Sequence, residues 1–160
     1  MIIISGIDGV LCPSIFTNDG SQDEESPEFQ AQLLAVPLLP WVTVSLPNMY
    51  QKARIVIFVT RRGVHLNNIT TTWVAERLHI HSFRIVNLGF TASHQYFDER
   101  RAFFDEAINQ CMKARETFNE NIHVLEEDPA ILDYIVEMAK CLAGVVVYAI
   151  RDGELCIEYP

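Results

Sequence analysis

The sequence predicts an α/β fold in which helices cover a mostly parallel sheet. Short runs of β-branched residues, typical of strands buried on both faces, alternate with stretches whose apolar residues recur at helical spacing. A chain of 160 residues, 49% of them apolar, is long enough to bury one substantial core. The expected strands are residues 1–5, 53–59, 83–88, 122–125 and 145–150.

Three longer helices are expected between these strands. The first begins near Leu66, the second covers about residues 98–118, and the third follows Asp128. The third has the clearest ends, because Asp128 suits the N-cap and Pro129 suits the first helical position. Gly144 follows its last apolar turn and suits a helix C-terminus.

The segment of residues 12–52 interrupts this alternation. Its polar part, residues 18–28, predicts an exposed loop, and residues 29–36 suit a short helix before three prolines. The segment is too short for a separate domain, so we expect one domain over residues 1–160 with a flap or lid at 12–52. At the other end, AIRDGELCIEY predicts a hairpin that turns at Asp152-Gly153 and adds an antiparallel edge strand.

Charge and hydropathy exclude several classes of protein. The formal net charge of −9, from 21 acidic and 12 basic residues, argues against a broad nucleic-acid-binding surface and suits a divalent cation or a basic protein partner. No apolar run approaches the ~18 residues of a membrane span. The N-terminal MIII is too short for a signal peptide, so we expect a cytoplasmic protein without a membrane anchor.

Polar clusters follow three of the expected strands. Residues 6–9 (GIDG) follow the first, residues 60–62 (TRR) the second, and residues 126–128 (EED) the fourth. Ligands of open parallel sheets bind beyond the carboxyl ends of the strands, where the strand order reverses. We therefore expect the three clusters to meet at one edge of the sheet.

The same clusters resemble motifs of the haloacid dehalogenase (HAD) superfamily of phosphohydrolases. The first strand and its loop, IIISGIDGVL, are similar to an apolar strand followed by D-x-D-G-[TV]-[LV]. The second strand, IVIFVTRR, resembles the motif that ends in Thr or Ser, and HVLEEDPAIL resembles the motif that ends in an acidic pair. Their order covers almost the whole chain outside residues 12–52. The resemblance implies a three-layer, Rossmann-like (HAD-like) fold without a large cap.

The resemblance also implies roles for individual residues. Asp8 matches the general acid/base, and Thr60 matches the phosphate contact; we include Arg61 among the expected phosphate-binding residues and Asp8 among the expected ligands of Mg²⁺. A family lysine that offsets phosphate charge falls within DERRAFF, where Arg100 or Arg101 supplies the charge; we include Arg101 among the expected phosphate contacts. The remaining metal ligands fall on Glu126, Glu127 and Asp128, and which of them align with the family's pair stays open.

One position departs from the motif. Gly6 stands where the family has the aspartate that attacks phosphorus, and glycine has no side chain for that step. Ser5 does not replace it, because adjacent residues of a strand point to opposite faces. The leading hypothesis is an inactive or attenuated HAD-like protein that keeps a phosphate- or Mg²⁺-binding edge or serves as a protein-interaction module. The alternative is a Mg²⁺-dependent, nucleotidase-like phosphohydrolase with a rearranged site, acting on a nucleotide or another phosphorylated small molecule.

Plainer interpretations of the same residues stay open. Asp8 with Gly9 also suits an ordinary turn, and Thr60 suits a helix N-cap. Arg61 and Arg62 suit a solvated pair, and residues 126–128 suit acids placed at a helix start by the helix dipole. A third hypothesis is a binding protein whose partner contacts the acidic loop of residues 19–28.

Overall fold

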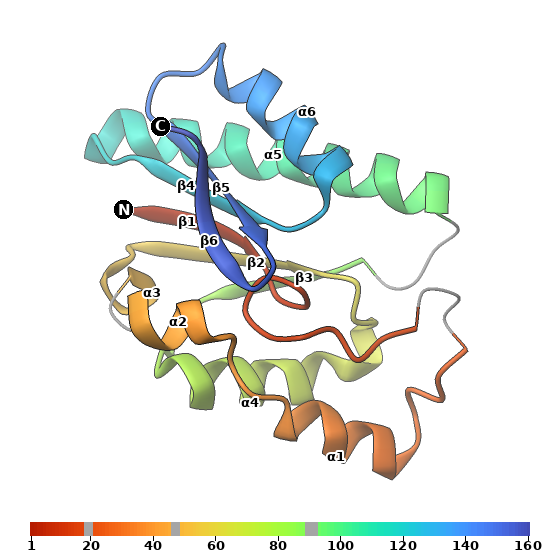
Figure 1. The fold of residues 1–160 in the computed structure, drawn as a ribbon. Helices are drawn as coiled ribbons and strands as arrows, with labels where there is room; N and C mark the ends of the chain where they lie inside the picture. The colour runs from red at the N-terminus through yellow and green to blue at the C-terminus, as the bar shows by residue number, and fades with distance from the viewer. Residues whose placement is uncertain (18–20, 46–48, 89–92) are drawn as a thin grey trace.

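The computed structural model describes residues 1–17, 21–45, 49–88 and 93–160, without the side chains of residues 44–45, 93–97 and 117–118. At its centre is a six-stranded sheet in the order β3-β2-β1-β4-β5-β6 (Figure 1). Neighbouring strands are parallel except β5 and β6, which are antiparallel. This confirms the predicted α/β fold and its C-terminal antiparallel pair. The strands are β1 (Ile2–Gly6), β2 (Ile55–Thr60), β3 (Arg84–Asn87), β4 (Ile122–Glu126), β5 (Val145–Arg151) and β6 (Glu154–Tyr159).

Strand β1 lies in the middle of the sheet and is buried along its whole length. Its isoleucines alternate between the two faces, since Ile3 belongs to one hydrophobic core and Ile2 and Ile4 belong to the other. This explains why the strand is a continuous apolar run rather than an alternating one. The edge strands β3 and β6 are less buried.

Helices cover both faces of the sheet (Figure 1). On one face lie α5 (Ser93–Phe118) and α6 (Pro129–Ala139), whose Phe104, Ile108 and Ile131 enter the same core as Ile2. On the other face, Trp73 and Val74 of the long helix α4 enter the core of Ile3. The elements of this second layer are α1 (Pro27–Ala35), α2 (Pro40–Ser45), α3 (Met49–Lys52), the short 3₁₀ helix η1 (Val64–Leu66) and α4 (Asn67–Leu78).

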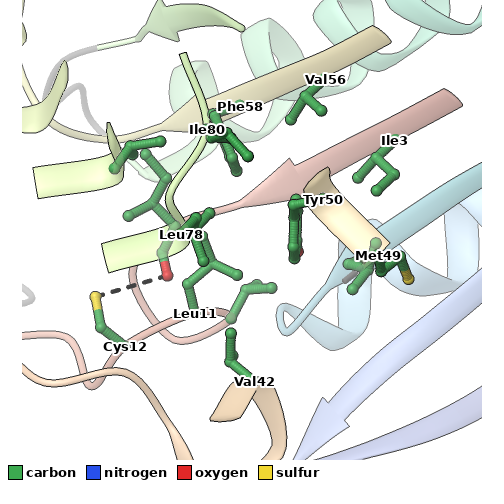
Figure 2. Close-up of a cluster of buried hydrophobic side chains, with 14 of the residues drawn as sticks. Ile3, Leu11, Cys12, Val42, Met49, Tyr50, Val56, Phe58, Leu78 and Ile80 are labelled. Carbon is green, nitrogen blue, oxygen red and sulfur yellow. Dashed lines mark hydrogen bonds between the residues drawn. The ribbon is translucent and has the colours of Figure 1, made fainter. Parts of the chain in front are cut away.

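The segment of residues 12–52 carries the short helix predicted at residues 29–36, as α1, but it is otherwise more regular than the predicted flap, since it also carries α2 and α3. Trp41 is buried in the core of this face of the sheet, and Val42 and Tyr50 are buried there with Phe58 (Figure 2). The Trp41 indole Nε1 donates to the Val10 carbonyl at 2.8 Å, which ties the segment to the loop after β1. The sequence did not predict α2 and α3, because helices of six and four residues span too few turns to show a helical period.

The ends of the C-terminal elements partly match the sequence. Asp128 caps α6 by accepting from the Ala130 N–H at 3.0 Å, as predicted. The helix ends at Ala139, however, and Gly144 instead adopts a left-handed conformation (φ 75°) just before β5. The hairpin turn is confirmed, because Asp152 and Gly153 both have positive φ (52° and 76°), as a type I′ turn requires.

Candidate functional site

The strand order puts the switch point of the sheet, where open α/β sheets usually have their ligand crevice, between the carboxyl ends of β1 and β4. From β1 the chain adds β2 and β3 on one side and then crosses to β4 on the other, so the strand order reverses at this point. The point from which the connections run in opposite directions is the usual ligand site of a doubly wound sheet. The loop of residues 6–9 and residues 126–128 flank this point. They touch, since a Cβ added at Gly9 would lie 2.6 Å from Cδ of Glu127.

Asp8 is held in a bidentate ion pair with Arg62. Arg62 Nε donates to Oδ2 at 2.9 Å and Arg62 Nη2 donates to Oδ1 at 2.7 Å, while the Thr60 hydroxyl donates to Oδ2 at 3.3 Å. The Arg62 side chain is 0% exposed and that of Asp8 is 9% exposed. The guanidinium also lies over the ring of Trp73, with Cζ 5.4 Å from the ring centroid. Both carboxylate oxygens of Asp8 are therefore engaged inside the protein.

The positive charge of Arg62 is maintained despite its burial. Burial on its own lowers the pKa of the Arg62 guanidinium, but the charge of Asp8 and its hydrogen bonds raise that pKa above its ordinary value. Arg62 therefore remains a cation. The turn that delivers it is shaped by Thr60, whose Oγ1 accepts from the Arg62 N–H at 3.1 Å.

A second buried ion pair joins the end of β4 to α5. Glu126 is 0% exposed and accepts from Arg100 Nη2 through Oε2. Its Oε1 accepts from the N–H groups of Glu127 (2.8 Å) and Asp128 (3.1 Å). Arg100, 5% exposed, has its Nη2 3.7 Å from where a Cβ of Gly6 would lie. A guanidinium therefore lies beside the position at which the resemblance expects a nucleophile.

Glu127 and Asp128 differ in their surroundings. Asp128 Oδ1 is engaged as the N-cap of α6. Glu127 is exposed on one side, yet partial burial and then the charge of Glu126 raise the pKa of its carboxyl group, against the opposing charges of Arg100 and Arg61. The fold therefore disfavours the ionised form of Glu127.

The structure brings together most, but not all, of the residues selected from the sequence. Thr60 contacts Asp8, and Arg61 lies near enough to Glu127 to influence its pKa. Arg101, expected among the phosphate contacts, instead places its Cζ 4.2 Å from the ring centroid of Tyr134 on α6. Arg100 is the neighbour of Gly6 and Glu126, because the two arginines point in different directions from the same helix.

Sequence reasoning missed the central role of Arg62. It selected Arg61 as a phosphate contact and left Arg62 out, whereas Arg62 is the buried guanidinium that pairs with Asp8. No local pattern separates the two arginines, because only the path of the chain around Asp8 decides which of them is buried. The argument about Ser5 is confirmed: its hydroxyl donates to the Gly6 carbonyl at 2.8 Å and lies 3.0 Å from the Tyr50 hydroxyl, within the core beneath α3.

The expected Mg²⁺ ligands do not fit a metal site as they are arranged. Among the residues whose side chains the structure describes, no group of three or more His, Cys, Asp or Glu is placed to hold a metal ion. Mg²⁺ needs carboxylate oxygens with accessible lone pairs. Those of Asp8 and Glu126 face guanidinium and backbone N–H donors instead.

No family model, curated protein or solved structure matched the chain. In the part of the chain that the structure describes, no helix combines the length and the apolar character that a membrane span needs. The class that fold and site define is a doubly wound α/β protein whose carboxyl edge is closed by two buried arginine–carboxylate pairs. Because one fold supports many functions, its function is argued from these residues.

Glu127→Gln is expected to stabilise the protein at pH 7. A carboxyl group whose pKa is raised in the folded state lowers the free energy of unfolding at pH values above that pKa. This destabilisation disappears at pH values below the pKa of the unfolded state, about 4.3. Solvent exposure limits the gain to under about 1 kcal/mol. Urea unfolding at pH 7 and pH 4 measures it, with Glu76→Gln on α4 as the exposed control. A less stable variant at pH 7 would show that Arg61 and Arg100 outweigh the burial.

Proposed function

We propose that the chain is a non-catalytic, HAD-like protein whose former catalytic edge is held by ion pairs, and that it acts as a protein-interaction module. The observation that carries the proposal is the position of Arg100 Nη2, 3.7 Å from the Cβ site of Gly6, where a nucleophilic carboxylate and a cation would otherwise meet. A fixed guanidinium can donate hydrogen bonds to a phosphoryl oxygen, but it cannot attack phosphorus and it cannot ligate a metal ion that activates water.

The state of Asp8 supports the same conclusion. A general acid needs a carboxyl oxygen that can reach the leaving group, whereas both carboxylate oxygens of Asp8 accept hydrogen bonds from the buried guanidinium of Arg62. Deleting the nucleophile of another enzyme lowered its turnover on the order of a millionfold. With Gly6 at that position and Asp8 engaged, the arrangement favours a binding role over phosphoryl transfer.

The geometry favours the interaction module over a phosphate- or metal-binding edge. The Thr60 hydroxyl and the Arg62 guanidinium could each donate a hydrogen bond to a phosphate, but both donate to Asp8 instead. A phosphate at this edge would have to displace that carboxylate from a side chain that is 0% exposed. A partner that contacts the outer surface of the protein requires no such exchange.

The test is release of phosphate from nucleotides and sugar phosphates in the presence of Mg²⁺. We expect no release above background from the wild-type protein. We expect none from Gly6→Asp, because the new carboxylate would meet Arg100 and its Cβ would lie 2.7 Å from Val10 Cγ2. Mg²⁺-dependent release that Asp8→Asn abolishes, with folding checked by circular dichroism, would refute the proposal and favour the phosphohydrolase with a rearranged site.

A further inference from the structure

A groove of about 720 Å³ runs between α6 and the β5–β6 hairpin, beside the carboxyl edge of the sheet. Its apolar lining comes from Pro129, Leu132 and Val136 of α6 and from Ile150 of β5. Glu127, the residue directly after β4, is also part of the lining. The volume falls in the range of ordinary ligand sites, and the apolar lining provides surface that a partner can cover.

The polar lining of the groove is strongly acidic. It contains five carboxylates and one guanidinium, that of Arg151, which pairs with Glu158 Oε1 at 2.7 Å. Glu137 pairs with Lys140 at 2.5 Å. Asp133 and Asp152 are exposed, and the described residues place no Lys, Arg or His in an ion pair with either. The lining carboxylates are those of Glu127, Asp133, Glu137, Asp152 and Glu158.

One feature of the groove opposes stability in the isolated protein. Asp133 and Glu137 both belong to the lining and are four residues apart on α6, a spacing at which like charges destabilise a helix. Surface charges that cost stability are expected where a function retains them. A cationic side chain of a partner beside these two carboxylates would offset their repulsion.

We propose that this groove binds a basic, amphipathic peptide segment of a partner protein. A metal ion is not favoured, because no group of three described carboxylates is placed to hold one. The carboxylates instead surround an apolar lining. A segment in which lysine or arginine alternates with aliphatic residues matches both features, since its charged groups reach the acidic walls while aliphatic groups cover Leu132 and Ile150.

The net charge of −9 favours the same class of partner, since it attracts a basic segment over long range and repels nucleic acid. The inference extends the proposed function by giving the interaction module a site and a partner class. The two proposals are tested separately. Phosphatase activity would refute the non-catalytic role but would not bear on peptide binding by the groove. Absence of peptide binding would refute the groove as a peptide site but would not bear on the non-catalytic role.

The test uses a fluorescein-labelled synthetic peptide of ten alternating lysine and leucine residues, with a glutamate-for-lysine version as its control. The variant Asp133→Asn with Asp152→Asn removes two groove charges, and Glu76→Gln with Glu116→Gln removes two charges from exposed positions on α4 and α5. We expect the groove variant to weaken binding about 10-fold or more and the control variant less than about 2-fold at low salt. The acidic peptide should not bind.

Amide chemical shifts of the ¹⁵N-labelled wild-type protein locate the peptide without any substitution. Changes concentrated at α6 and the β5–β6 hairpin would support the site. Equal weakening by the two charge variants, shift changes spread over other surfaces, or no binding of the basic peptide below about 1 mM would each overturn it. Val136→Thr keeps the shape of the lining but makes it more polar, so we expect this variant to bind the basic peptide more weakly than the wild-type protein.

Discussion

Asp8→Ala is expected to lower the free energy of unfolding by about 3–5 kcal/mol, because it leaves the guanidinium of Arg62 buried without its counter-ion. The same change removes the acceptor for the Thr60 hydroxyl. Urea unfolding followed by circular dichroism at neutral pH measures the loss. A residue that serves only as a catalytic acid commonly behaves in the opposite way, since its removal leaves stability unchanged or improved.

The double variant Asp8→Ala with Arg62→Met is the control for this first prediction. Methionine keeps apolar volume next to Trp73 without a charge, so the pair of changes should recover at least about half of the loss. A loss of under about 1 kcal/mol for Asp8→Ala would show that the ion pair does not hold this edge together. It would also return Asp8 to the list of candidate catalytic groups.

Glu126→Ala is expected to have an effect of similar size, about 3–5 kcal/mol, for a related reason. The substitution leaves the guanidinium of Arg100, which is 5% exposed, buried without its counter-ion. It also removes the acceptor of the Glu127 and Asp128 N–H groups at the start of α6. The loss is measured by the same unfolding experiment. Hydrogen exchange at the first turn of α6 should accelerate as well, because its anchoring to β4 is lost.

Glu126→Gln separates the two parts of this effect. The amide oxygen can still accept from the two N–H groups but carries no charge for Arg100, so its loss should lie between zero and that of Glu126→Ala. Glu154→Gln, at an exposed position of β6, should change stability by less than about 0.5 kcal/mol. If Mg²⁺ raised the melting temperature of the wild-type protein and Glu126→Gln removed that response, Glu126 would be a metal ligand after all.

These two pairs explain how a family resemblance and a different chemistry coexist in one chain. The motifs place Asp8 and Glu126 at the ends of β1 and β4, where a doubly wound sheet binds its ligands. Arg62 and Arg100 then engage both carboxylates. Under the proposed function these ion pairs close the edge that would hold phosphate and metal, and the acidic groove beside it is the proposed binding surface.

Local patterns were sufficient for the strands, for the start of α6 and for the C-terminal hairpin. A run of β-branched residues indicates a buried strand. The backbone preferences of Asp128-Pro129 and Asp152-Gly153 determine the conformation of the chain within a few residues. The direction of Ser5, away from the crevice, followed from the two-residue period of a strand. The convergence of the loops at one edge followed from the alternation of strands and helices, which implies a parallel sheet.

Contacts between distant parts of the chain decided what these patterns left open. The partner of Asp8 is 54 residues away and that of Glu126 is 26 residues away, so neither pairing leaves a local trace. No local pattern shows that Arg100 rather than Arg101 lies beside Gly6. No local pattern predicts the burial of Trp41 either, because it packs on a sheet formed by other segments. Backbone conformation responds to near neighbours, whereas the burial and pairing of a charge depend on which surfaces the fold brings together.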